Sequence, residues 1–411
     1  MKSNYKPIGK YIRLVDERNA GLKIPTLLGL SISKEFIPSV ANIIGSDMEN
    51  YKIIRRNQFA CSLMQVRRDK KMPVALLKEM DEAIISQAYP VFEVIDPEIL
   101  LPEYLMMWFS RPEFDREACF YAVGGVRGGL EWEDLCNMQL PVPAIEKQKE
   151  IVKEYHTIVD RIRLNEQLNQ KLEETAQAIY KQWFVDFEFP DEEGRPYKSS
   201  GGEMVGSDIG EIPKNWDLWQ INGFCDITSS KRIFYDDYVN EGVPFYRGKE
   251  ITLKKQGKPI EDIIYIRKDK YRSIVDKYGK PESGDILLTA VGTLGSSYFV
   301  QQEDFYFKDG NVIWFKNFKS PGYNHLLYDF MQSKRFLELI QEITIGSTQN
   351  AITIDTIGQR QHVMPPKHII ESYCHLSKPL LECSNNRKNL GVRLESLKNL
   401  LLAELAQNRI N

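Results

Sequence analysis

The sequence predicts an α+β chain of two mixed α/β domains, each ending in one long amphipathic helix. Three observations indicate this architecture. The apolar pattern repeats with one constant offset of 222 residues, and each copy ends in an extended helical pattern. A segment rich in Gly, Pro and Ser separates the two copies. A chain of 411 residues is long enough for two or three domains.

The repeat needs no gap from about residue 91 to the end of the chain. Its period lies far above the 20–50 residues of solenoid repeats, so it indicates a duplicated domain. The matched positions carry side chains of the same kind. The pairs include Phe92 and Trp314, Leu105 and Leu327, Trp108 and Phe330, Phe114 and Phe336, Gly124 and Gly346, Leu130 and Ile352, Leu135 and Ile357, Pro143 and Pro365, and Leu172 and Leu394.

The long helices are predicted over residues 145–189 and 367–411. In the second, apolar residues alternate at spacings of three and four, which is typical of a heptad seam. The first helix carries Asn165 where the second carries Arg387, and such a polar pair could fix their register. Two helices of equal length can bury their apolar stripes on each other. The second stripe comprises Tyr373, Leu376, Leu380, Cys383, Leu390, Leu394, Leu397 and Leu401.

Ahead of each long helix the pattern is mixed. Short strands are predicted at residues 89–95, 285–291, 296–300 and 311–315, bounded by Gly, Pro, Asp and Asn. One helix is predicted in each copy, over residues 103–114 and 325–336.

The domain boundary is predicted at residues 190–215, because this segment has almost no apolar periodicity. The resulting plan is a first domain over 1–144, a helix over 145–189, the linker, a second domain over 216–366 and a helix over 367–411.

The composition is that of a soluble globular protein, with 42% hydrophobic and 27% charged residues. No run approaches 18 apolar residues, which argues against a membrane span, and residues 1–10 do not resemble a signal peptide. The six cysteines form no C-x-x-C pair, so reduced thiols in a cytosol are expected.

Charge is unevenly distributed, although the net charge is only −3. Residues 51–78 hold eight Lys or Arg and a single acid, a net +7, and residues 231–280 have a net charge of +5. Such runs are often solvated surface, but they are also the electrostatic pattern of a polyanion-binding face.

Several motifs of the sequence resemble those of a known family. Residues 181–205, "KQWFVDFEFPDEEGRPYKSSGGEMV", are followed by "GEIPKNW" and, at residues 241–251, by "EGVPFYRGKEI". Together with the repeated order of helix, Gly-containing loop, "LPVP" or "VMPP", and long helix, they resemble the specificity subunits of type I restriction–modification systems. The first copy departs at its start, where "YKPIGKYIRL" replaces a G-x-I-P-x-x-W opening.

The resemblance implies two target-recognition domains, each recognising one half of a split DNA site. It implies that the long helices pack antiparallel as a coiled-coil rod, with an approximate two-fold relation between the halves. It also implies docking of two modification subunits, which methylate adenine with S-adenosylmethionine, and of restriction subunits that use ATP and Mg. The chain itself is expected to need no cofactor and to act in the cytoplasm.

The residues agree with a non-catalytic role. The sequence has no G-x-x-x-x-G-K-[ST] loop for ATP and no F-x-G-x-G or [DNS]-P-P-[YF] motif of adenine methyltransferases. His368, Cys374, His375 and Cys383 lie close in sequence, but a zinc site is not expected because both cysteines fall on or beside the apolar stripe.

Candidate DNA-contacting residues lie in three places, since base edges are usually contacted by Arg, Lys, Asn, Gln, Ser and Thr on loops or helix starts. Arg67 and Arg68 follow a predicted strand. Arg247 and Lys249 lie in "YRGKEI". The loops after Gly124 and Gly346 carry different polar residues on matched scaffolds, namely Arg127 in one and Ser347, Thr348, Gln349 and Asn350 in the other.

Two other functions remain open from the residues alone. A coiled-coil scaffold that binds only protein would explain the helices but not the two mixed domains with basic segments. A self-contained nuclease would need an acidic and lysine metal cluster, which the sequence does not show.

Overall fold

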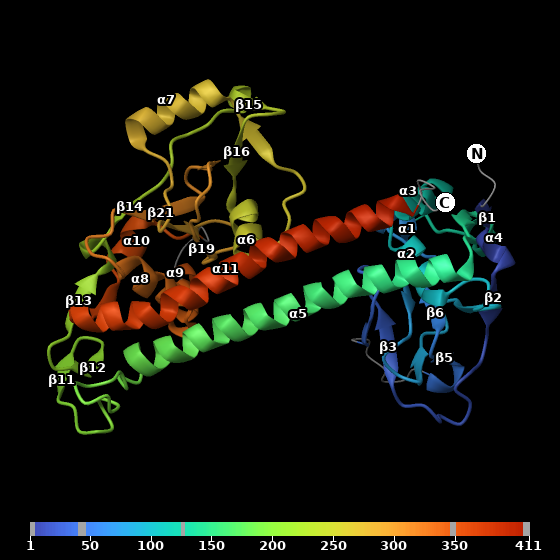
Figure 1. The fold of residues 1–411 in the computed structure, drawn as a ribbon, viewed down its shortest axis with the longest axis horizontal. Coiled ribbons are helices and arrows are strands. Elements are labelled where there is room, and N and C mark those ends of the chain that lie inside the picture. Colours follow the sequence, from blue (N-terminus) through green and yellow to red (C-terminus); the bar gives the residue numbers. More distant parts are fainter. Residues whose placement is uncertain (1–4, 40–46, 125–127, 346–350, 406–411) are drawn as a thin grey trace. The chain divides into compact units, whose positions relative to one another are not determined.

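In the computed structural model, residues 5–39, 47–124, 128–345 and 351–405 are described. The chain divides into two compact units (Figure 1). The first unit comprises Met1–Arg161 and Ser396–Asn411, and the second comprises Ile162–Glu395. The division falls inside the long helices α5 (Ile145–Phe184) and α11 (Lys367–Glu404), so each helix contributes to both units.

The first unit is built on two four-stranded sheets. Its elements are β1 (Tyr5–Pro7), β2 (Ile12–Val15), β3 (Leu27–Leu30), β4 (Phe36–Pro38), β5 (Lys52–Arg55), β6 (Gln58–Cys61), α1 (Val66–Asp69), β7 (Val74–Leu76), β8 (Glu82–Ile85), β9 (Val91–Val94), α2 (Pro102–Phe109), α3 (Pro112–Tyr121), α4 (Trp132–Asn137) and β10 (Gln139–Pro141). The strand orders are β2-β9-β6-β7 and β4-β3-β8-β5, and β1 pairs with β10. Phe59 and Phe92 stack at 4.9 Å between ring centroids in the core.

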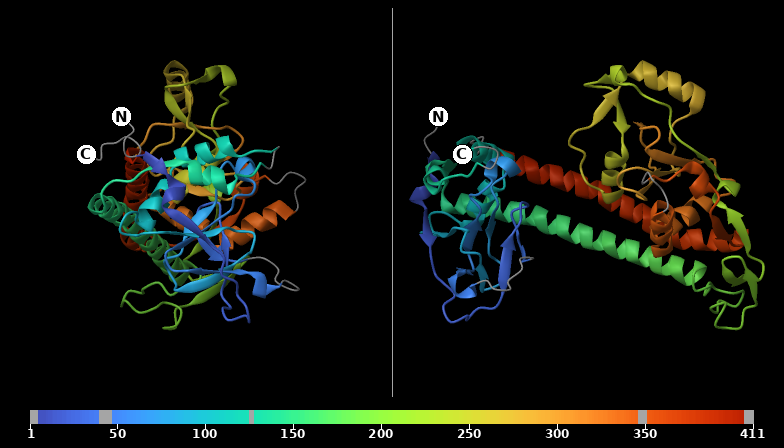
Figure 2. Two further views of the ribbon diagram at one scale, coloured as in Figure 1. Left: turned by 90° about the vertical axis from the view of Figure 1, so that its right-hand side faces the viewer. Right: turned by 180° about the vertical axis from the view of Figure 1, so that it is seen from behind.

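The second unit repeats this plan with additions. Its elements are β11 (Met204–Ser207), β12 (Gly210–Pro213), β13 (Asp217–Gln220), β14 (Asp226–Thr228), β15 (Tyr238–Val239), β16 (Val243–Tyr246), α6 (Gly248–Gln256), β17 (Ile264–Ile266), α7 (Lys268–Tyr278), β18 (Ile286–Thr289), β19 (Ser297–Phe299), β20 (Tyr306–Phe307), β21 (Val312–Lys316), α8 (Tyr323–Gln332), α9 (Lys334–Ile345), α10 (Ile354–Gly358) and β22 (Gln361–Met364). The sheet β15-β17-β16-β20 and α7 form a lobe of this unit, visible in both views of Figure 2.

The internal repeat is confirmed by the strand order. The sheet β14-β21-β18-β19 of the second unit has the order of β2-β9-β6-β7 in the first, and β13 pairs with β22 as β1 pairs with β10. The helices α8, α9 and α10 follow the strands as α2, α3 and α4 do. The correspondence therefore extends ahead of residue 91, where the sequences show no clear match.

The prediction of one helix before each Gly-containing loop is wrong, since each copy has two. Arg111 between α2 and α3 has an extended backbone (φ −75°, ψ 137°), because a residue that precedes a proline is driven out of the helical region. Ser333 between α8 and α9 is also extended (ψ 156°), and its hydroxyl accepts a hydrogen bond from the Phe336 backbone N–H. Helical periodicity continues through both breaks, so the pattern alone did not show them.

The segment predicted as a linker, residues 190–215, is folded over part of its length. β11 and β12 form an antiparallel hairpin, and Ile212 is buried in the core of the second unit. Just after the segment, Trp216 stacks on Phe189 with ring centroids 5.0 Å apart. The few apolar residues of the segment are spaced too irregularly to give a periodic signal, yet they pack against the end of α5.

The long helices pack antiparallel. In the second unit, Trp183 and Phe184 near the end of α5 contact Tyr373 near the start of α11, at 5.7 and 4.7 Å between ring centroids. In the first unit, Leu402 near the end of α11 is buried in the same core as Ile151 near the start of α5.

The expected leucine seam is wrong in its details. Leu376 and Leu397 are each 46% exposed, whereas Ser377 and Ser384 are buried. On the same face of α11, a Cβ on Gly391 would lie 3.3 Å from the Asn165 amide nitrogen. Small and polar residues therefore form the contact between the two helices. Each of them comes one position after a residue that the heptad pattern assigns to the contact.

Candidate nucleic-acid interface

In the first unit, Arg67 and Arg68 lie on the one-turn helix α1 between two residues in left-handed conformation, Gln65 (φ 60°) and Lys70 (φ 53°). Val66 is fully buried, and its carbonyl accepts a hydrogen bond from Cys119 Sγ of α3 at 3.4 Å. This anchor turns the two arginines outward, and both are exposed.

The structure brings Arg67 next to the loop after Gly124. Its backbone N–H donates to the Gly128 carbonyl at 3.2 Å, and Nη1 donates to the Gly124 carbonyl at 3.4 Å. A Cβ on Gly128 would lie only 2.8 Å from the Val123 carbonyl oxygen, so the tight loop requires glycine there. Arg127, the predicted contact residue of this loop, lies outside the described residues.

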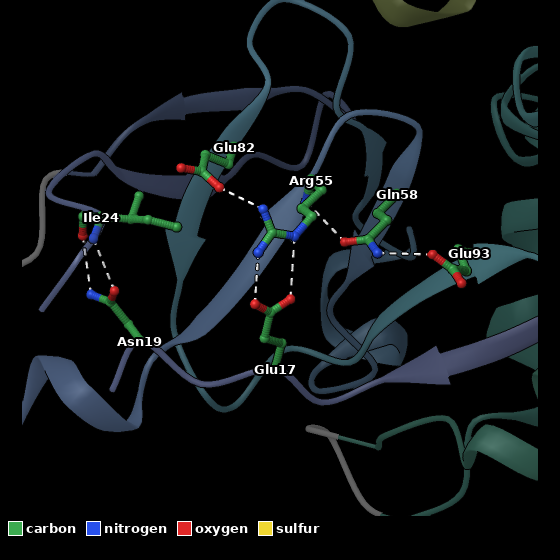
Figure 3. A network of polar contacts seen from close by, with 7 residues as sticks. All are labelled: Glu17, Asn19, Ile24, Arg55, Gln58, Glu82 and Glu93. Atoms are coloured by element: carbon green, nitrogen blue, oxygen red, sulfur yellow. Dashed lines mark hydrogen bonds and ion pairs between the residues drawn. The ribbon is translucent and has the colours of Figure 1, made fainter. Parts of the chain in front are cut away.

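Much of the positive charge of residues 51–78 is paired with acids from elsewhere in the chain. Arg55 donates hydrogen bonds of 2.6 Å to Glu17 and to Glu82 (Figure 3). These bonds, above all the one to Glu17, raise the pKa of the Arg55 guanidinium. Arg56 pairs with Asp81 at 2.9 Å, and Lys78 pairs with Glu103. These cations therefore stabilise the fold locally.

A buried amide organises that network. Gln58 accepts a hydrogen bond from the Arg55 backbone N–H at 2.8 Å and donates to Glu93 at 2.8 Å (Figure 3). Glu93 in turn pairs with Arg13. The cations that remain on the exposed surface of this segment lie around α1. They are Arg67, Lys70, Lys71 and Arg68, the last paired with its neighbour Asp69 at 2.6 Å.

In the second unit, Arg247 and Lys249 lie at the start of α6 but differ in environment. The Arg247 backbone N–H donates to Glu250 Oε2 at 2.8 Å, and its Nη2 donates to Oε1 at 2.6 Å. Glu250 is buried, which raises its pKa, but the hydrogen bonds from Arg247 outweigh this and hold the pKa below its ordinary value. Arg247 is therefore the N-cap residue of α6 with its guanidinium bound to Glu250, whereas Lys249 is exposed.

The start of α6 lies beside the counterpart of the Arg67 loop. Ile352 N–H donates to the Ala290 carbonyl at 3.0 Å, as Leu130 N–H donates to the Leu63 carbonyl at 2.8 Å in the first unit. Gly248 lies close to Val291, which forms a bridge with Ala351. The predicted residues Ser347, Thr348, Gln349 and Asn350 lie outside the described residues.

Exposed aromatic side chains near the basic segments were missed by the sequence analysis. Phe120, at the end of α3 beside α1, is 82% exposed. In the second unit Phe234 and Tyr235 are exposed in the loop before β15. The available signal was the juxtaposition of cations and rings in "KRIFY" at residues 231–235.

Within the described ranges, no three His, Cys, Asp or Glu residues are grouped in a way that could hold a metal ion. In the same ranges, no helix is both long and apolar enough to cross a membrane.

Comparison with known proteins gives consistent results. Residues 67–174, which include most of α1, the Gly124 loop and most of α5, match the family described as type I restriction modification DNA specificity domain. The MjaIX specificity subunit of Methanocaldococcus jannaschii is 25% identical over 322 residues, covering 76% of this chain and 70% of that protein. The HindI specificity subunit of Haemophilus influenzae is 32% identical over 114 residues, covering 27% and 24%.

The fold has a solved counterpart. The crystal structure of the type I restriction–modification S subunit from M. genitalium matches 98% of this chain and 95% of its own, with a TM-score of 0.60 and 12% identity. The matched segment is similar to the DNA specificity domain of type I systems, and the duplicated fold is similar to that of a solved S subunit. The resemblance to the specificity subunits of type I systems, which the sequence motifs indicate, is thereby confirmed.

Proposed function

We propose that the chain is the DNA-sequence-specificity subunit of a type I restriction–modification complex and that it recognises a bipartite, asymmetric target. One observation carries the proposal. The match to the DNA specificity domain covers Arg67, Arg68 and the Gly124 loop, on a fold that occurs twice in the chain with the same strand order. Two recognition units of one fold suit two half-sites, and a fused pair is free to diverge.

The divergence of the two units supports an asymmetric target. The loop after β6 carries Arg67, Arg68, Lys70 and Lys71, whereas the corresponding loop after β18, residues 290–296, carries no charge. One backbone hydrogen bond beside these loops is equivalent in the two units, from Leu130 N–H to the Leu63 carbonyl and from Ile352 N–H to the Ala290 carbonyl. A fixed scaffold with different exposed side chains is expected when each unit contacts a different sequence.

The chain on this proposal has no catalytic activity. Methyl transfer with S-adenosylmethionine and cleavage with ATP and Mg belong to two modification subunits and to restriction subunits that dock on it. Exposed leucines on the long helices support docking, because apolar side chains that lie together on a surface mark protein contacts. They are Leu164, Leu168 and Leu376 in the second unit and Leu397 and Leu400 in the first. The complex would act in the cytoplasm.

The direct test is methylome sequencing of cells that express the chain with its modification subunit. The expected result is adenine methylation at one split motif whose two halves differ. Cells expressing the modification subunit alone are the control. Unchanged methylation, or a contiguous motif, would contradict the proposal.

A further inference from the structure

Two neighbouring aromatic rings point into solvent in the second unit. Phe234 is 60% exposed and Tyr235 is 83% exposed, whereas the preceding Ile233 is buried with Phe245 and Ile266 in the core of the lobe. The loop therefore uses one apolar side chain for folding and leaves two on the surface. Large rings in water are unfavourable, so their position calls for a partner.

The loop that carries the rings is held at both ends. On one side, Ser230 Oγ donates to the Phe307 carbonyl at 2.6 Å, and the Lys231 N–H donates to Tyr306 Oη at 3.0 Å. On the other side, buried Asp237 pairs with Arg267 at 3.3 Å and with Lys270 at 3.4 Å. The rings are thus presented on a fixed support, which lowers the entropic cost of binding.

Exposed cations lie on the same loop as the two rings and on the adjoining helix α7. Lys231 Nζ lies 4.7 Å from the centre of the Tyr278 ring and Lys277 Nζ lies 5.1 Å from it, so the loop and the end of α7 form one surface. Lys268 and Arg272 are exposed on α7, and neither they nor these lysines form an ion pair with a described residue. The exposed acids on the loop and α7 that no ion pair occupies are Asp236 and Asp276, so positive charge prevails.

We infer that this aromatic–basic surface, formed by Lys231, Phe234, Tyr235, Lys277 and Tyr278, is a second DNA contact of the second unit, in addition to the start of α6. Phe234 and Tyr235 enter a groove of the duplex and pack against a base step, while the lysines contact flanking phosphates. The inference rests on the proposed function.

The observations favour a duplex over a protein as the partner. Apolar wedges flanked by cations are a known means of groove binding, and unpaired lysines suit a polyanion. Arg247, the other prominent cation of this unit, is already engaged by Glu250, so this surface supplies positive charge that the start of α6 does not.

The test uses the chain assembled with its modification subunits and a duplex that carries the mapped target, with 2-aminopurine placed at successive positions of each half-site. Phe234→Ala/Tyr235→Ala, which removes both rings, should weaken binding about tenfold or more, since the loss of a single stacked ring usually has an effect of that order. When the unchanged chain binds, the fluorescence of 2-aminopurine at the contacted step should rise. When the variant binds, this rise should be absent. Leu337→Ala, which removes a 53% exposed leucine on α9, is the matched control and should bind normally.

A second variant tests the charges. Lys231→Gln/Lys277→Gln should reduce the slope of log affinity against log salt by about two, since each phosphate contact contributes about 0.9. Thermal unfolding of every variant checks that the lobe remains folded.

Each alternative outcome is distinct. Normal DNA affinity and fluorescence in the aromatic variant would overturn the inference and leave the proposed function intact. Loss of assembly with the modification subunits would show that the surface binds protein, which also overturns it. If the assembled, unchanged chain shows no preference for any target, the proposed function itself fails, and the inference with it.

Discussion

The side-chain amide of Asn165 in α5 donates a hydrogen bond of 2.7 Å to the backbone carbonyl of Arg387 in α11, which is its equivalent 222 residues further along the chain. Equivalent positions of the two copies therefore meet each other, as expected for antiparallel helices that pack about a local two-fold relation. Asn165 is buried beside Gly391, where the helices come close. A polar side chain at such a contact favours one register over its neighbours.

Removing this contact should weaken the second unit. Asn165→Ala is expected to lower the free energy of unfolding by about 1 kcal/mol, the typical net contribution of one hydrogen bond. Urea unfolding measures the change, and Gln167→Ala on the exposed side of the same turn is the control. Equal stability of both variants would show that the amide does not hold the helices in register.

A second prediction concerns the pH dependence of stability. Asp329 in α8 is buried, which raises the pKa of its carboxyl from 3.8 to about 6, although the hydrogen bond from Tyr373 Oη at 2.7 Å acts in the opposite direction. The folded chain therefore binds this proton more tightly than the unfolded chain. Its contribution to stability is full below pH 4 and is lost as the pH rises to about 6.

Asp329→Asn should remove that dependence, because the amide keeps an acceptor for Tyr373 and never ionises. At pH 7.5 the variant is expected to be more stable on the order of 1–3 kcal/mol, and at pH 4 the gain should vanish. Urea unfolding at both pH values, with exposed Asp276→Asn as control, gives the comparison. A gain of equal size at both pH values would contradict the assignment to ionisation. The first copy carries buried Met107 at this position, so the effect belongs to the second unit.

The third prediction concerns the end of the chain. Leu402 is 3% exposed and packs in the core of the first unit, whereas Leu400, two residues earlier, is 56% exposed. Leu402→Ala should lower the stability of the first unit by about 2–5 kcal/mol, as for other buried leucines. Leu400→Ala should change it by less than about 0.5 kcal/mol. Hydrogen exchange can localise the loss, which should appear in β6 and β9 and not in β18 and β21.

The sequence was informative about elements whose signal is periodic and repeated. The 222-residue offset predicted the duplicated domain, and the stripes around Ile151 and Tyr373 predicted the long helices. The same periodicity misplaced their contact, because a heptad interpretation assigns apolar residues to the seam. Here Ser384 and Gly391 allow close approach, while Leu376 and Leu397 remain exposed.

For the candidate interface, residue type and charge made Arg67 a candidate but could not show which cations are already paired with acids. Arg55 and Arg56 lie in the same basic run as Arg67, yet the acids that pair with Arg55 come from residues 17 and 82. Such pairing depends on contacts between distant strands and cannot be read from a local sum of charges. The same holds for Arg247, whose partner Glu250 is buried only once the second unit is folded.

The last prediction uses this contrast. Arg67→Ala, in the chain assembled with its modification subunits, should weaken binding to the mapped target about tenfold to a hundredfold, because a base-edge or phosphate contact is lost. If Arg67 contacts a base, methylation should relax at one position of a single half-site. If it contacts a phosphate, the salt slope should fall by about one with the motif unchanged.

Arg55→Ala is the matched control, since Arg55 is exposed but bound to Glu17 and Glu82. It should cost up to about 1 kcal/mol of stability and leave affinity and motif as they were. Equal loss of affinity in both variants would mean that general positive charge, and not the surface around α1 and the Gly124 loop, determines binding by the first unit.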